Sequence, residues 1–301
     1  MLPFWILFNA FVLGMLAADL WIFNRPAQQP SVRQALAWSA TWIALAAAFA
    51  LLVYFWQGRQ SALEFTAGYV IELSLSVDNL FLFLIIFRYF QVPGEFQHRV
   101  LFWGIVGAII ARGIFIVLGV ALIHTFRWMI YIFGAFLMWT GIKFFRQKVE
   151  VQPEANAVLR LVRRCIPITE SYEGGRLFVR RGRLYATPLL IVLLVIETTD
   201  LLLAADSIPA VLAITLNTFI VYTSNVFAVL GLRSLFSVLS GMMGIFHYLH
   251  YGLSIILIFM GAKMLASDYY RIPTGVALAI VAGILLASIL ISVMHPKTAA
   301  T

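Results

Sequence analysis

Glu72–Asn79 reads ELSLSVDN, with carboxylates at its first and seventh positions, and lies inside a long apolar run. A second stretch, Asp200–Ser207, reads DLLLAADS and has carboxylates at the same two positions. Carboxylates within a membrane span are costly and rare, and they mark functional sites by default. The two matched stretches therefore predict a charged functional centre inside a membrane protein.

The composition supports the membrane assignment. Of 301 residues, 62% are hydrophobic and only 11% are charged, with a mean hydropathy of +0.96. Soluble domains usually carry about 25% charged residues. The net charge of +8 indicates Lys and Arg in cytoplasmic loops and gives no support for nucleic-acid binding. The single cysteine, Cys165, excludes an intramolecular disulfide and a cysteine-based metal cage.

Nine apolar segments predict an all-α polytopic membrane protein with about nine transmembrane helices. The first segment lacks a basic start and a small-residue cleavage site, so we expect it to be an uncleaved span. The predicted spans are 3–23, 35–56, 66–90, 100–122, a segment ending near Lys143, 188–213, 220–241, 245–265 and 272–294.

Residues 146–186 form the one long polar segment, and its excess of Arg places it in the cytoplasm. With nine spans, the amino terminus is then outside and the carboxyl terminus inside. A solvated linker that fixes topology is the favoured interpretation of this segment. Docking of a protein partner or of anionic lipids is the alternative.

The sequence predicts two three-helix units that repeat within the chain. Arg112 matches Arg233, and the endings GIK and GAK also match. Each unit has an odd number of spans, so the second copy runs in the opposite direction, as in many secondary transporters. Chance similarity between apolar helices is the alternative. The predicted organisation is two N-terminal helices (1–60), the first repeat (61–145), the basic cytoplasmic loop (146–186), the inverted repeat (187–267), and a C-terminal helix with a tail (268–301).

Two carboxylates six residues apart on a regular helix are separated by about 9 Å along the axis and about 120° around it. Glu72 and Asp78 therefore cannot both bind one ion from an unbroken helix. Either the helix unwinds between them, or carboxylates pair across the two repeats. Inversion favours pairing at equal depth, with Glu72 beside Asp206 and Asp78 beside Asp200, near the membrane midplane.

The two stretches supply oxygen ligands without His or Cys, a set that suits Mg²⁺, Ca²⁺ or Mn²⁺ better than Zn²⁺ or Cu⁺. The alternative is that the acids neutralise the two buried arginines, and a mixture of both roles is expected. The predicted metal ligands are Glu72, Asp78, Asn79, Asp200, Asp206 and Ser207. The predicted supporting or pathway residues are Glu197, Ser76, Arg112, Arg233, Asp19 and Glu64.

The chain resembles the TerC family of membrane proteins over nearly its full length and is similar, more distantly, to LysE-type exporters. The resemblance implies export of Mn²⁺ or a related divalent cation across the bacterial cytoplasmic membrane, and an association with tellurite resistance. The resemblance also implies that the acidic residues of the family's motifs are Glu72, Asp78, Asp200 and Asp206 in this chain. The stretches that carry it are AADLWIFNR (17–25), GYVIELSLSVDNLFLF (68–83), QHRVLFWGI (97–105), FGAFLMWTGIK (133–143), and 200–209 continuing to TSNVFAVLGLRSLF (223–236).

Two positions depart from the family pattern. Leu73 replaces a usual Lys after the first Glu, and 215–219 lacks a common acidic residue. The loss of that Lys removes a positive neighbour of the first Glu, so either the ion selectivity or the resting state of this chain is expected to differ from that of its relatives.

The sequence thus predicts a transporter that exports divalent cations, with Mn²⁺ favoured. Another hard cation such as Ca²⁺ is one alternative, and a membrane scaffold for metal or tellurite stress, acting through residues 146–186, is another. An enzyme is not expected, because the chain has no HExxH motif, phosphate-binding loop or nucleophile–base pair. The expected partners are the bilayer and the transported cation, with no cofactor. Proton coupling and the oligomeric state are left open.

Overall fold

A computed structural model describes residues 2–23, 32–146, 167–169, 171–181, 183–241, 249–270 and 272–294. These described residues form nine helices and one β-hairpin, and each helix coincides with one predicted span. The predicted all-α membrane fold is confirmed. The helices are α1 (Leu2–Phe23), α2 (Val32–Gln57), α3 (Arg59–Tyr89), α4 (Gly94–Thr125), α5 (Met129–Arg146), α7 (Pro188–Leu212), α8 (Thr218–Gly241), α9 (Leu249–Leu265) and α10 (Thr274–Met294); the strands are β1 (Phe178–Arg181) and β2 (Arg183–Ala186).

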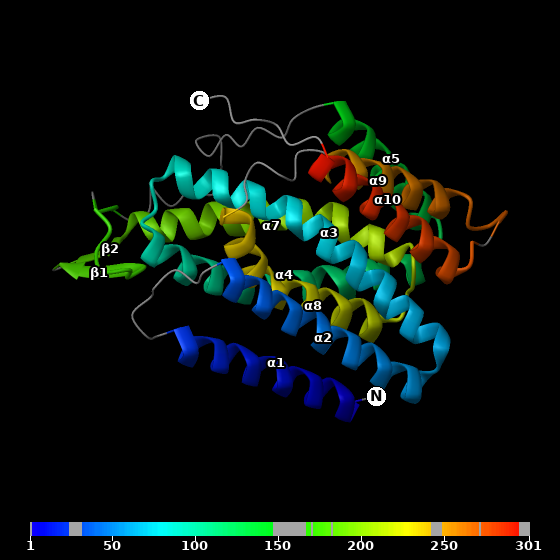
Figure 1. The fold of residues 1–301 in the computed structure, drawn as a ribbon, viewed down its shortest axis with the longest axis horizontal. Coiled ribbons are helices and arrows are strands. Elements are labelled where there is room, and N and C mark those ends of the chain that lie inside the picture. The colour runs from blue at the N-terminus through cyan, green and yellow to red at the C-terminus, as the bar shows by residue number, and fades with distance from the viewer. Residues whose placement is uncertain are drawn as a thin grey trace.

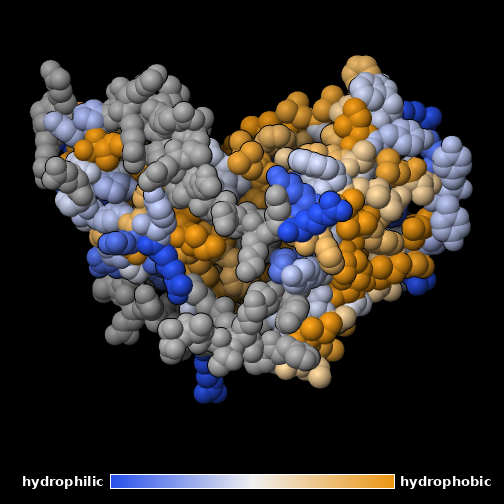
Figure 2. Space-filling model, turned by 90° about the horizontal axis from the view of Figure 1, so that it is seen from above, coloured by the Kyte–Doolittle hydropathy of each residue, from blue (hydrophilic) through white to orange (hydrophobic). Residues whose placement is uncertain are grey.

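The outer surface of the bundle is apolar, as a lipid-facing surface must be. Seven of the described helices are long and apolar enough to cross a membrane, and the apolar parts of α1 and α9 are shorter. Large side chains such as Leu7, Phe55 and Leu202 are more than 60% exposed. Broad hydrophobic areas are visible in Figure 2, with hydrophilic residues at the right-hand edge of the molecule. An exposed surface of this kind is explained by a bilayer around it.

The helices form layers around α3, α4, α7 and α8 (Figure 1). In that view α1 and α2 lie below this centre, α5, α9 and α10 lie above and to the right, and the hairpin lies at one end. Helix α3 packs against α8, α4 against α7, and α5 against α9. If α3, α4 and α5 correspond to α7, α8 and α9, exchanging the two units turns the α3–α8 pair into the α7–α4 pair and leaves the α5–α9 pair unchanged. The inverted repeat itself stays a prediction.

Glycines bring the backbones of α5 and α9 into close contact. A Cβ atom built on Gly261 would lie 2.6 Å from the carbonyl oxygen of Gly134, and one built on Gly141 would lie 2.8 Å from that of Ser254. The two contacts run in opposite directions along the helices, so α5 and α9 are antiparallel. Small residues at a helix interface permit such packing in membranes.

The ends of α3 show how the sequence directs the chain between helices. Gly58 alone separates α2 from α3, and its φ of +88° is a conformation that favours glycine. At the other end, the Gln91 amide donates to the Arg88 carbonyl and the Val92 amide to that of Phe87, at 3.1 and 2.9 Å. With Gln91 at φ +51°, this is a Schellman cap. Pro93 then precedes α4.

Two hydrophobic clusters make up the interior, and charged residues lie where they meet. Along α4, Ile109 belongs to the first cluster and Ile116 to the second, with Arg112 between them. Along α7, Ile196 and Ala204 bracket Asp200 in the same way. The bundle therefore encloses a charged layer between two apolar regions.

The polar segment predicted at 146–186 contains a hairpin that hydropathy did not indicate. Strands β1 and β2 pair antiparallel, from Phe178 opposite Ala186 to Arg181 opposite Arg183. The residues before β1 attach to the turn between α3 and α4. The Tyr172 hydroxyl donates to the Phe90 carbonyl at 2.7 Å, and Arg99 donates to the Gly175 carbonyl at 2.6 Å. Burial raises the pKa of Tyr172. Residues 147–166 lie outside the described part of the chain.

Candidate functional site

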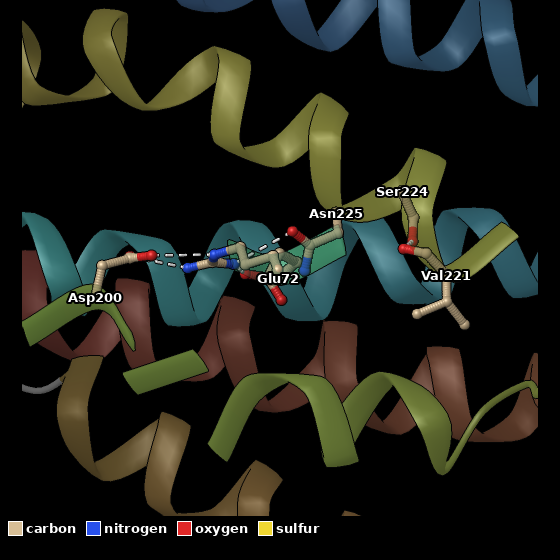
Figure 3. A network of polar contacts seen from close by, with 6 residues as sticks. Glu72, Asp200, Val221, Ser224 and Asn225 are labelled. Atoms are coloured by element: carbon tan, nitrogen blue, oxygen red, sulfur yellow. Dashed lines mark hydrogen bonds and ion pairs between the residues drawn. The ribbon is translucent and has the colours of Figure 1, made fainter. Parts of the chain in front are cut away.

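Arg112 of α4 is the centre of a buried polar network. Its side chain is 1% exposed. It forms an ion pair with Glu72 of α3 and a two-pronged pair with Asp200 of α7, at 3.0 Å from Nη2 to Oδ1 and 3.3 Å from Nε to Oδ2. Nη1 also lies 3.5 Å from Oδ1 of Asn225 on α8. In Figure 3, Asp200 lies on one side of this network and Glu72 and Asn225 lie on the other, with dashed lines for the contacts between the residues drawn. We call these four residues the Arg112 centre.

The Arg112 centre joins four helices through one planar group. A guanidinium can bind carboxylates on two of its edges at once, which an ammonium group cannot match. Charges this deeply buried remain stable only when they are paired and hydrogen-bonded. The interpretation that the acids neutralise a buried arginine is therefore supported for Glu72 and Asp200.

Acids exceed bases in this layer. Glu197 precedes Asp200 by one turn of α7 and is close enough to interact with it electrostatically. The carboxylate of Glu197 occupies the space that the absent side chain of Gly107 on α4 leaves open. Glu72 and Asp200 both pair with Arg112, and Glu197 adds a third acid beside Asp200. Such an excess must be balanced by bound protons or by a cation.

The predicted pairing of Glu72 with Asp206 is wrong. Glu72 lies with Asp200 at Arg112, while the carboxylate of Asp206 accepts a hydrogen bond from Thr140 of α5 at 3.1 Å. The prediction inferred each residue's depth in the membrane from its position along a straight helix. It did not take into account that the long side chain of Arg112 pairs with both Glu72 and Asp200. The second pair, Asp78 with Asp200, involves the side chain of Asp78, which lies outside the described residues.

Asp206 and Asn79 line a small cavity of about 20 Å³ between α3, α5, α7 and α9. Asn79 is buried, with 4% of its surface exposed. His250 of α9 completes the polar part of the wall. The rest of the wall is apolar and consists of Leu75, Phe144, Leu203 and Leu253. We call this space the Asp206 cavity; its volume is sufficient for one water molecule or one ion.

His250 lines the cavity but was not among the residues predicted for the site. The predicted ligand set contained oxygen only, because neither acidic stretch contains a histidine. The fold adds one from a helix that begins more than 40 residues after Asp206. The two acidic stretches gave no indication that a histidine from another helix would lie beside them. The nearest hint was a histidine at the start of the helix paired with α5.

The other predicted residues lie at several positions. Ser76 and Ser207 are buried, and their hydroxyl groups have no partner among the described residues. Arg233 is buried on α8. Glu64 accepts a hydrogen bond from Gln60, which also donates to Thr274 of α10. Asp19 is on α1, with its side chain outside the described residues.

The predicted ligands do not gather into one metal site. Among the described residues, no three His, Cys, Asp or Glu side chains lie together in an arrangement that could hold a metal ion. Instead they divide between the Arg112 centre and the Asp206 cavity. The cavity offers two such side chains, Asp206 and His250, and adds the amide of Asn79.

Comparison with known proteins places these features in a family. The model for the integral membrane protein TerC family matches residues 57–300. An uncharacterized membrane protein of Myxococcus xanthus, STKORF319, is 48% identical over 299 residues, covering 99% of this chain and 94% of the relative. The putative membrane-bound redox modulator Alx of Escherichia coli K12 is 43% identical over 296 residues, covering 95% of this chain and 92% of the relative.

A further relative is an uncharacterized membrane protein of Rickettsia bellii, 38% identical over 293 residues, with 97% of each chain covered. No solved structure matches. The family model covers more than half of the chain, and the apolar helices agree with its description. The chain is therefore an integral, multi-pass membrane protein that belongs to the TerC family.

Proposed function

We propose that this protein transports divalent metal cations out of the cytoplasm, with Mn²⁺ as the favoured substrate. The observation that carries the proposal is the Asp206 cavity. There, the carboxylate of Asp206, which accepts a hydrogen bond from Thr140, lies beside the buried amide of Asn79. Carboxylate and amide oxygens are the ligands that hard divalent cations prefer.

The energetics of burial support a cation rather than an anion. Asp206 is partly buried, and removing a carboxylate from water costs free energy that nearby positive charge offsets. Arg112 is already occupied by Glu72 and Asp200. A dication that enters the Asp206 cavity would add to the positive charge that Lys143 already supplies near this carboxylate.

The Arg112 centre has a supporting role in this proposal. It holds α3, α4, α7 and α8 together beside the cavity, which lies between α3 and α7 on the side of α5 and α9. Transport then requires the cavity to open on each side of the membrane in turn. Sites at the meeting point of two helical repeats are typical of secondary transporters.

The membrane and orientation are part of the proposal. We assign the protein to the bacterial cytoplasmic membrane, with the amino terminus outside and the carboxyl terminus inside. The relatives named redox modulators raise a second possibility, but the chain contains one cysteine and so lacks a dithiol pair of its own. A change in cellular redox state as a result of altered metal content is compatible with the transport proposal.

The test is the metal content of cells that lack the protein and are complemented with variants. Wild type should lower cellular Mn²⁺ under Mn²⁺ load, and Asp206→Asn should fail to do so. Glu95→Gln is the matched control, because Glu95 is an exposed acid in the first turn of α4. Membrane insertion of every variant is checked by immunoblotting of membrane fractions. If Mn²⁺, Ca²⁺ and Zn²⁺ contents are all unaffected by wild type, the transport proposal is wrong.

A further inference from the structure

A large pocket lies at the end of the bundle opposite the hairpin, where α9 connects to α10 (Figure 1). Its volume is about 820 Å³, within the range of pockets that hold small organic ligands. The wall combines residues from the ends of α4, α7 and α9 with the beginnings of α5 and α10. Among the described residues, this α9–α10 pocket shares no lining residue with the Arg112 centre or the Asp206 cavity, so it is a separate site.

Hydrogen-bond donors, two of them positively charged, supply much of the polar part of the wall. Arg127 provides a guanidinium from the turn between α4 and α5, and Lys263 an ammonium from the last turn of α9. The ammonium donates to the Ala213 carbonyl at 3.0 Å, which uses one of its three N–H groups. The hydroxyl oxygen of Ser267 is buried and has no hydrogen-bond partner among the described residues. These groups leave donors available for a ligand.

The acidic groups near the pocket are engaged elsewhere. Asp268 is the one carboxylate in the described lining, and it accepts a hydrogen bond from the Tyr131 hydroxyl. Glu64 is close enough to Lys263 to interact with it electrostatically, but it is not among the described lining residues. The available donors therefore suit an anionic group, to which charge-assisted hydrogen bonds are strongest.

The remaining wall is apolar or aromatic and has the composition of a membrane interface. Trp128 and Tyr270 line the pocket and are 56% and 68% exposed. Such rings gather at the level of the lipid headgroups. A small inorganic ion would leave the apolar side chains uncovered, whereas a ligand with hydrocarbon chains would cover them. These apolar lining residues are Ile123, Ile130, Ile214, Leu216, Met264 and Ile272.

We infer that the α9–α10 pocket binds the phosphate-bearing headgroup of a phospholipid, with Arg127 and Lys263 at the phosphate oxygens. A guanidinium matches the geometry of phosphate with two parallel hydrogen bonds, and basic pockets between transmembrane helices bind lipid headgroups. Free inorganic phosphate offers the same chemistry to these donors but lacks the chains that would cover the apolar wall. The inference is independent of the transport proposal and involves no metal.

The experiment is native mass spectrometry of the full-length protein, freed of lipid in detergent and titrated with phosphatidylglycerol. Wild type should bind one lipid molecule more tightly than any further ones. Arg127→Gln should weaken this first binding about tenfold, because hydrogen bonds to a charged group are lost. Arg127 is exposed, so the variant should fold normally. Arg59→Gln is the matched control and should bind as wild type, because Arg59 is an exposed arginine at the start of α3, outside the described lining.

Two further ligands distinguish the sources of the phosphate group. Diacylglycerol, which has the chains without the phosphate, should bind at least about tenfold more weakly than phosphatidylglycerol. Inorganic phosphate at millimolar concentration should leave the binding of phosphatidylglycerol unchanged. Recognition of phosphate is overturned if diacylglycerol binds equally well, or if Arg127→Gln retains the wild-type affinity. Displacement of the lipid by inorganic phosphate would overturn the lipid as occupant. A wild-type protein without a preferred first lipid would overturn the whole inference and leave the transport proposal unaffected.

Discussion

Arg112 is bound on two edges by carboxylates from helices on opposite sides of it, so its loss would leave two buried charges without a partner. Most arginines of this chain lie at helix ends or in the polar segment. At exposed positions among the described residues, such as Arg127, the charge is hydrated and substitution costs little. The loss of an arginine is therefore expected to lower the stability of the protein much more at the buried position than at an exposed one.

Arg112→Met should destabilise the protein strongly. Breaking a buried ion pair by removing one partner costs about 3–5 kcal/mol, because the remaining charges stay buried. Adding Glu72→Gln to Arg112→Met should recover part of the loss, since it removes one of the stranded carboxylates. The melting temperature of the purified protein in detergent measures both effects.

Arg127→Met is the control for this prediction, because Arg127 is exposed in the turn between α4 and α5. It should melt close to wild type. An Arg112→Met protein that melts at the wild-type temperature would show that Glu72 and Asp200 do not depend on this arginine.

At the scale of elements, the packing of α5 on α9 depends on the absence of side chains. Gly261→Ala should destabilise the protein by about 1–3 kcal/mol, as overpacking of a close contact does. The added methyl group would push against the backbone of Gly134 and the side chain of Met138. Thermal unfolding in detergent is the measurement.

Gly283→Ala on α10 is the matched substitution, because a Cβ at that position meets nothing within 4 Å. Alanine there should be neutral or stabilise the helix by up to about 1 kcal/mol. Equal melting temperatures for the two alanine variants would contradict the close backbone contact.

At the scale of the whole molecule, the direction of the chain through the bilayer can be tested with its one cysteine. Cys165 lies in the polar segment predicted to be cytoplasmic, outside the described residues. A membrane-impermeant maleimide should label it in inside-out vesicles and leave it unlabelled in intact spheroplasts. Cys165→Ser supplies the background signal. Labelling from the outside alone would reverse the predicted orientation.

The sequence was sufficient to predict where the helices are, because the transfer of apolar residues to lipid dominates their placement. It was less accurate for their ends. The span predicted from residue 66 belongs to a helix that begins at Arg59, since polar residues continue a helix beyond the apolar core. The hairpin at Phe178–Ala186 was missed because only eight strand residues carry its pattern.

The acidic residues were identified from the sequence, but their arrangement was not. Contacts such as those of Arg112 depend on how helices cross and on side-chain reach, and neither is encoded in spacing along one helix. His250 approaches Asp206 through the packing of α9 on α5, which is a property of the assembled bundle. A single sequence carries no direct signal of such contacts.

The glycine contacts between α5 and α9 have a mechanical consequence. At these glycines the two helices meet backbone to backbone, and the rings of Phe145 and Tyr251 pack edge to face across the same interface. By contrast, α1, α2, α3 and α8 are joined by rings such as Phe8, Phe49, Phe65 and Phe227, which pack edge to face or at tilted angles. Because α5 and α9 supply Phe144 and His250 to the cavity wall, any shift of one helix along the other would change the shape of the cavity.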